Sequence, residues 1–315
     1  MTLALALLSG ALLVAALMPT LLWWLHTRVD PLLLIAGWIL SIVGVLGTVV
    51  AAVALLVLEG HGASANLVRA VHGCWTAISH GGPPQLQQIA GIAGSAVLVT
   101  LTARLALIGW RQSRRRRHAR EQRLGLLWLA GHSDAGRPPT LWLEHSRPLA
   151  FSLAGRRPLV VATQGLAQRL TEREVLAVLE HERAHVRGHH HLLLAAAQTL
   201  SGAVPVLPLL RQAPVALTDL VELAADATAS RYCGAGVLHD ALAKVSSFDL
   251  PPAALAVGNH AVELRLRRLV DAAPTRAPAQ RAVGAGLVGA ASVIAPVAAA
   301  TAVFTTVAAV LCTLF

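Results

Sequence analysis

The residues best suited to chemistry in this chain are His181 and His185, which flank Glu182 in the run His-Glu-Arg-Ala-His. At a spacing of four residues on a helix, both imidazoles lie on one face and can bind a single metal ion. Glu182 lies beside that face, where its carboxylate can take a proton from a water molecule. The motif therefore favours a zinc hydrolase with Glu182 as its catalytic base.

A further ligand is needed, because catalytic zinc usually takes three protein ligands and a water. Glu222 and Asp226 are four residues apart in a second helix-patterned stretch that ends near Gly234. Their carboxylates therefore face the same way. We predict that Glu222 is the third ligand. Asp226 is then placed to accept a hydrogen bond from a ligand imidazole and fix its orientation.

The cluster His189–His191 offers an alternative third ligand. His189 lies one turn beyond His185, but three ligands along one straight helix cannot surround one ion. The outer pair would be separated by about 12 Å of helix rise. We interpret the cluster instead as a polar helix end, whose imidazoles offset the C-terminal helix dipole.

The elements that must position these residues are indicated on the N-terminal side of the motif. Short β-rich runs at 141–143, 149–153 and 158–162 precede the histidine-bearing helix. Thr171 and Glu174 form a capping box that predicts where this helix begins. The order of strands followed by a metal-binding helix indicates an α+β domain.

The rest of the chain is typical of a membrane protein. Hydrophobic residues make up 55% of the 315 residues and charged residues only 13%, far from the average of soluble proteins. The apolar runs long enough to cross a bilayer are 3–25, 31–58, 86–110 and 283–315. No basic residue precedes the first run, so we interpret it as a retained helix and not a cleaved signal peptide. We predict a mainly α integral membrane protein with about four transmembrane helices.

Basic residues predict the orientation of these spans. The run Arg111–Arg120 abuts the third span and indicates the cytoplasmic side. We therefore expect three transmembrane helices in 1–110 with an extracytoplasmic loop at 59–85, a cytoplasmic domain at 111–282, and a fourth transmembrane helix at 283–315. Most of the net charge of +10 lies in this domain. Because no aromatic residues interleave the arginines, we expect contact with the lipid bilayer and no direct contact with nucleic acid.

The apolar stretch 192–210 separates the two ligand-bearing helices. A single membrane crossing there would place His181 and Glu222 on opposite sides of the membrane, where they could not share a metal ion. Four residues argue against a simple span: Gln198, Ser201, Pro205 and Pro208. We therefore predict an interfacial or re-entrant segment next to the site, or a buried hairpin.

In this order, the motifs resemble those of the membrane-embedded antirepressor metallopeptidases, the family of the BlaR and MecR sensors. The resemblance rests on five matching elements: Ala150–Ser152, Gly155, His181–His185, Glu222–Asp226 and Arg265–Leu269. A more distant likeness is to the prenyl-protein and HtpX-type membrane peptidases, which share the two ligand motifs.

The resemblance implies a zincin-like fold of the gluzincin type between spans three and four. It implies one zinc ion per chain, with His181, His185 and Glu222 as ligands, Glu182 as general base and acid, and Asp226 as the residue that orients a ligand. The implied activity is endopeptidase cleavage of a cytosolic protein, a BlaI-like transcriptional repressor, in regulatory signalling at a bacterial plasma membrane. Self-cleavage and a homodimer are left open. An extended substrate is expected to pair with a strand, either 151–153 or 160–162.

Two features depart from that family. Many relatives carry Asp at the position of His190, and the sequence ends at Phe315, so we expect the C-terminal penicillin-binding sensor domain to be lacking. Two other functions stay open: quality control of membrane proteins, as in HtpX-type peptidases, and a non-catalytic zinc-binding membrane regulator. Structural zinc usually has four protein ligands, often thiolates, and no cysteine pair lies near the motif.

Overall fold

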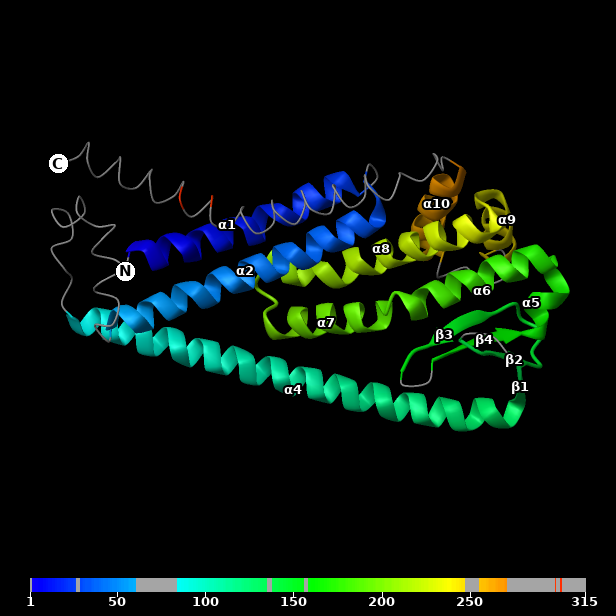
Figure 1. The fold of residues 1–315 in the computed structure, drawn as a ribbon, viewed down its shortest axis with the longest axis horizontal. Coiled ribbons are helices and arrows are strands. Elements are labelled where there is room, and N and C mark those ends of the chain that lie inside the picture. Colours follow the sequence, from blue (N-terminus) through cyan, green and yellow to red (C-terminus); the bar gives the residue numbers. More distant parts are fainter. Residues whose placement is uncertain are drawn as a thin grey trace. The chain divides into compact units, whose positions relative to one another are not determined.

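The computed structural model describes residues 2–26, 29–60, 84–134, 138–155, 158–246 and 255–270, together with positions 298 and 301. This part of the chain is mostly helical and contains one small sheet (Figure 1). The mainly α expectation is therefore confirmed. The predicted fourth span at 283–315 and the predicted loop at 59–85 lie almost entirely outside the described residues.

Three helices are long and apolar enough to cross a membrane. They are α1 (Thr2–Leu25), α2 (Pro31–Gly60) and α4 (Pro84–Ala130), with candidate spans at Leu3–Leu25, Pro31–Val57 and Ile92–Gln122. Helices α1 and α2 pack on each other, and the small side chains of Ala4 and Ala52 are fully buried between them. Small residues let two apolar helices approach closely where lipid offers no hydrophobic driving force.

The chain divides into two compact units. One contains the described residues of 1–108, 199–213 and 281–315, and the other contains those of 109–198 and 214–280. All the predicted site residues lie in the second unit.

The second unit contains a four-stranded sheet in the order β1-β2-β4-β3. The strands are β1 (Gly131–Asp134), β2 (Thr140–Leu143), β3 (Ala150–Leu153) and β4 (Leu159–Thr163). Only β2 and β4 pair in parallel. Every residue of β4 is buried, because its alternate side chains pack into two separate apolar clusters. β4 has a strand on both sides, whereas β3 lies at an edge of the sheet. The predicted strands near 141, 150 and 160 are all present.

The histidine-bearing helix α6 (Glu172–Arg187) packs against β3 and β4 (Figure 1). Its apolar face meets a core formed by Val160, Ala162 and the short helix α5 (Gln164–Arg169). The predicted capping box is confirmed: Thr171 Oγ1 accepts a hydrogen bond from the backbone N–H of Glu174, and Glu174 Oε2 accepts one from that of Thr171. This cap fixes the start of α6 and hence the placement of both histidines along it.

After α6 the chain turns sharply and forms α7 (His190–Ala203), α8 (Pro208–Cys233), α9 (Ala235–Ser246) and α10 (Leu255–Val270). The apolar stretch 192–210 is not one continuous helix, because α7 ends at Ala203 and α8 begins only at Pro208. The end of α8 before Gly234 agrees with the sequence prediction, and Gly234 adopts a positive φ of 91°. Such a left-handed residue after a helix is most easily a glycine.

Candidate metal centre

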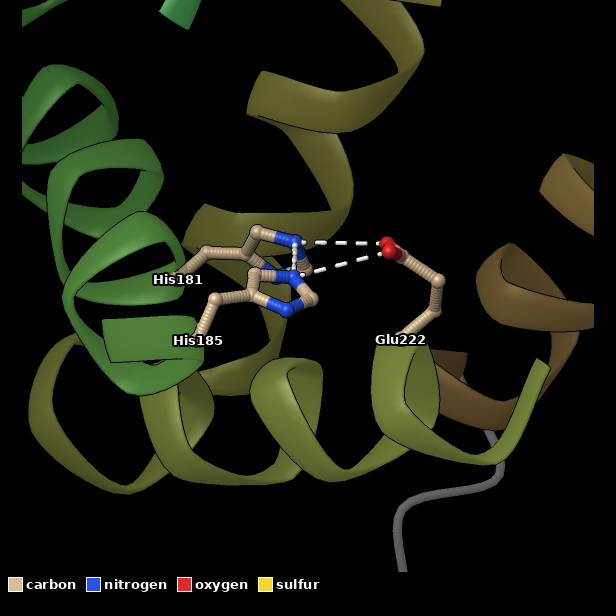
Figure 2. Close-up of side chains that lie close together, drawn as sticks. All are labelled: His181, His185 and Glu222. Atoms are coloured by element: carbon tan, nitrogen blue, oxygen red, sulfur yellow. Dashed lines mark hydrogen bonds and ion pairs between the residues drawn. The ribbon is translucent and has the colours of Figure 1, made fainter. Parts of the chain in front are cut away.

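Three side chains from two helices converge on one point in the second unit. His181 and His185 lie one turn apart on α6, and Glu222 lies on α8 (Figure 2). The two Nε2 atoms are 3.1 Å apart. Glu222 Oε2 is 3.4 Å from Nε2 of His181, and its Oε1 is 3.5 Å from Nε2 of His185. The structure therefore brings together the three residues that the two motifs predicted as ligands.

This donor set fits a catalytic metal ion. One potential ligand atom from each side chain lies within 4.8 Å of the other two. Two imidazole nitrogens and one carboxylate oxygen are the donors of many catalytic zinc sites, which keep a further position for water or substrate. The His181 side chain is only 9% exposed, whereas the Glu222 side chain is 34% exposed. The His181 side of the three-residue cluster is thus shielded from solvent, whereas the Glu222 side is accessible to it.

Asp226 holds the far side of the His181 ring. Its Oδ1 lies 2.9 Å from Nδ1 of His181, and its side chain is 5% exposed. Burial by itself would lower the pKa of His181, but the hydrogen bonds to Asp226 and Glu222 outweigh it and raise the pKa to about 9. Burial would raise the pKa of Asp226, but His181 and Arg265 lower it to about 2. This geometry is the one that an orienting residue for His181 requires.

Arg265 connects two carboxylates of α8, those of Glu222 and Asp226. Its guanidinium donates two hydrogen bonds to Asp226 and its Nη1 lies 3.2 Å from Glu222 Oε2. Burial would raise the pKa of Glu222, but the hydrogen bond from His181 and the charges of His181 and Arg265 lower it. Sequence reasoning placed Arg265 in a family-like run without giving it a role. The contact spans 39 residues, and helical spacing alone cannot reveal it.

Glu182 lies next to the converging residues and contacts the sheet edge. Its carboxylate accepts hydrogen bonds from the side chain and the backbone of Ser152 on β3. Burial raises the pKa of Glu182 above its usual range, and the nearby charge of His181 and the Ser152 bonds only partly oppose this shift. A carboxylate with a raised pKa is better suited to accept and return a proton near neutral pH.

The interpretation of His189–His191 as a polar helix end is wrong for His190. His190 is buried, and its Nδ1 lies 2.9 Å from Nδ1 of His185. The reason is the backbone of His189, whose φ of 49° turns the chain so that His190 faces inward while His189 stays exposed. Burial, followed by the charge of His181, lowers the pKa of His185 to about 4, so this imidazole is neutral at pH 7.

Comparison with known families agrees with this chemistry. The model of Peptidase family M48 matches residues 126–219. The matched region contains the sheet and both histidines of α6, and it ends before Glu222. It supports a metallopeptidase of this family, and it does not single out the BlaR and MecR type. No solved structure matches the chain.

Proposed function

We propose that this chain is a membrane-bound zinc endopeptidase. The observation that carries the proposal is the convergence of His181, His185 and Glu222, with Glu182 beside them. The match to Peptidase family M48 supports peptide-bond hydrolysis independently of this geometry. Three candidate membrane spans in the same chain support a membrane location.

In this proposal His181, His185 and Glu222 bind one zinc ion, and Glu182 is the general base and acid. The ion, when bound, supplies Lewis acidity that acidifies water and polarises a carbonyl oxygen. Glu182 takes the proton of the attacking water and returns it to the leaving amine. The raised pKa of Glu182 helps the first of these steps, because a more basic carboxylate accepts the proton of water more readily. It can still pass that proton to the leaving amine, which is the stronger base.

Asp226 and Arg265 support the ligand side chains. Asp226 fixes the ring of His181 through Nδ1, which would leave Nε2 available to bind a metal ion. Arg265 ties Asp226 to Glu222, so one cation balances two buried or half-buried carboxylates. The positions of the Glu222 and Asp226 carboxylates are thereby linked.

The sheet edge at β3 is the place where an extended substrate would pair. β4 has strands on both sides and cannot accept another, whereas β3 has one neighbour among the described strands. The Ser152–Glu182 hydrogen bonds link this edge directly to the proposed base. A peptide added to β3 through backbone hydrogen bonds would therefore lie beside Glu182.

The substrate we propose is a cytosolic transcriptional repressor of the BlaI type, with self-cleavage as a second event. Support comes from the order of the motifs and from the basic run Arg111–Arg120, which favours a cytoplasmic catalytic domain at a bacterial plasma membrane. A second candidate is quality control of membrane proteins, as in HtpX-type peptidases. The match to Peptidase family M48 is compatible with this second function, because the match is not specific to antirepressor enzymes.

Cleavage in membrane fractions tests the proposal. Membranes containing the full chain should cleave a co-expressed repressor, and Glu182→Gln should stop cleavage while zinc stays bound. Glu172→Gln is the matched control, because Glu172 is an exposed glutamate in the first turn of the same helix. Undiminished cleavage by Glu182→Gln would refute the proposed mechanism. A proteomic comparison of cells with wild-type and Glu182→Gln protein distinguishes the two candidate functions. Accumulation of one protein in the Glu182→Gln cells supports cleavage of a repressor, and accumulation of many proteins supports quality control.

A further inference from the structure

We propose that His190 is a positioning residue for the metal site. Its Nδ1 lies 2.9 Å from Nδ1 of His185, at hydrogen-bonding distance, and this contact fixes the ring whose Nε2 faces Glu222. The inference rests on the proposed function, because it requires a metal ion at His181, His185 and Glu222. It assigns a role to a residue that lies outside the two ligand motifs.

The two histidines of the motif are held in parallel ways. The far nitrogen of His181 lies 2.9 Å from a carboxylate oxygen of Asp226, and the far nitrogen of His185 lies 2.9 Å from Nδ1 of His190. The rings of His185 and His190 meet edge to face at 88°. A neutral imidazole that binds metal through Nε2 carries its proton on Nδ1, so His185 is the donor and His190 the acceptor.

The backbone conformation between α6 and α7 places His190 against His185. His189 adopts a positive φ of 49°, which is uncommon for a residue with a side chain. The result is an exposed His189 followed by a His190 that is only 7% exposed. A regular continuation of α6 could not bring residue 190 back against His185 at this distance, since five residues along a helix place side chains on different faces.

Gly188 makes room for the His190 ring. A Cβ at Gly188 would collide with Nε2 and Cδ2 of His190. The backbone of Gly188 is right-handed, with φ of −77° and ψ of −1°, so any residue could adopt it. The absence of a side chain is therefore required by the neighbouring imidazole and not by the backbone conformation.

Zinc affinity of the purified full chain in detergent, measured by competition with a chelator, tests the role of His190. His190→Leu fills the volume without an acceptor and should lower zinc affinity roughly 10- to 100-fold. His190→Asn places Oδ1 on the same branch of Cγ as the imidazole Nδ1 and should restore affinity close to wild type. The control is His189→Asn, which removes an exposed imidazole and tolerates a positive φ. It should leave affinity unchanged.

The cobalt(II) absorption spectrum of the same variants reports on ligand geometry without relying on activity. We expect a changed spectrum in His190→Leu and a wild-type spectrum in His190→Asn. Wild-type affinity in His190→Leu, or equal losses in both variants, would overturn the proposal while leaving the proposed function intact. A wild-type chain that binds no zinc would refute the proposed function itself and this inference with it.

Gly188→Ala provides a test that leaves every ligand and His190 in place. It should lower zinc affinity in the wild-type background, because the new Cβ displaces the His190 ring. It should have little further effect in the His190→Leu background, since two changes that act through one contact are not additive. Equal losses in both backgrounds would show that Gly188 acts independently of His190 and would contradict the inferred packing.

Discussion

Arg265 donates two hydrogen bonds to the carboxylate of Asp226, one of 2.7 Å from Nε and one of 2.8 Å from Nη2. The same carboxylate lies 2.9 Å from His181 Nδ1. Helix α10 therefore reaches the histidines of α6 through one residue of α8. A bidentate arginine–carboxylate pair is both strong and directional, so the position of the candidate metal centre depends on three helices.

Removing this cation should destabilise the second unit and weaken zinc binding. Arg265→Gln removes the bidentate arginine partner of the buried Asp226 carboxylate, and breaking such a pair costs about 3–5 kcal/mol. The matched control is Arg267→Gln on the same helix, whose exposed pair with Glu263 contributes at most about 1 kcal/mol. Chemical unfolding of both variants measures the difference. Equal stabilities of the two variants would contradict the structural role of Arg265.

Removing the Ser152 hydroxyl should shift the pH dependence of catalysis. The side-chain hydrogen bond of Ser152 lowers the pKa of Glu182, so Ser152→Ala should raise that pKa further. Because the base must be ionised to accept a proton, the acid limb of kcat/KM should move to higher pH. The pH profile of peptide cleavage measures this shift. A limb that stays in place or moves to lower pH would show that Ser152 does not contact the working base.

Zinc binding should release a proton at neutral pH. Without metal, the pKa of His181 of about 9 means that the imidazole is protonated at pH 7, and zinc must displace that proton. Apparent affinity should therefore rise as the pH approaches 9. Calorimetry in buffers with different ionisation enthalpies counts the released protons. Asp226→Asn should reduce this count, because the hydrogen bond to Asp226 helps to raise the pKa of His181. Equal counts in both proteins would contradict the proposed pair.

The same pair should make the metal-free protein less stable in alkali. A raised pKa in the folded state contributes stability that is complete below the unfolded value of 6.5 and is lost as the pH rises through about 9. Wild-type protein should thus lose more free energy of unfolding over this interval than Asp226→Asn. Chelator-treated samples, unfolded by denaturant at the two ends of the interval, measure the loss. Parallel losses would argue against a His181–Asp226 ion pair.

Local patterns in the sequence predicted much of the candidate site. The i, i+4 spacing placed His181 with His185 and Glu222 with Asp226, and the capping box at Thr171 predicted the start of α6. These features depend on residues within a turn or two of each other, where helix geometry is fixed. Three apolar runs likewise predicted the candidate spans at the N-terminal end.

Features that depend on tertiary structure could not be predicted from local sequence patterns. The Arg265–Asp226 contact joins helices that are distant in sequence, and no spacing rule connects them. His190 was assigned to a polar helix end because the sequence indicates a helix continuing past His185. The left-handed backbone of His189 interrupts it instead. Non-glycine residues adopt this conformation uncommonly, and no local pattern marked its occurrence at His189.

The zinc content of the purified full chain tests the central claim most directly. Wild-type protein and Glu182→Gln should each contain one zinc ion per chain, because Glu182 is assigned to proton transfer and not to ligation. Glu222→Gln should bind zinc far more weakly, because it removes one of three ligands. Full zinc content in Glu222→Gln, or none in the wild type, would contradict a metal centre formed by His181, His185 and Glu222.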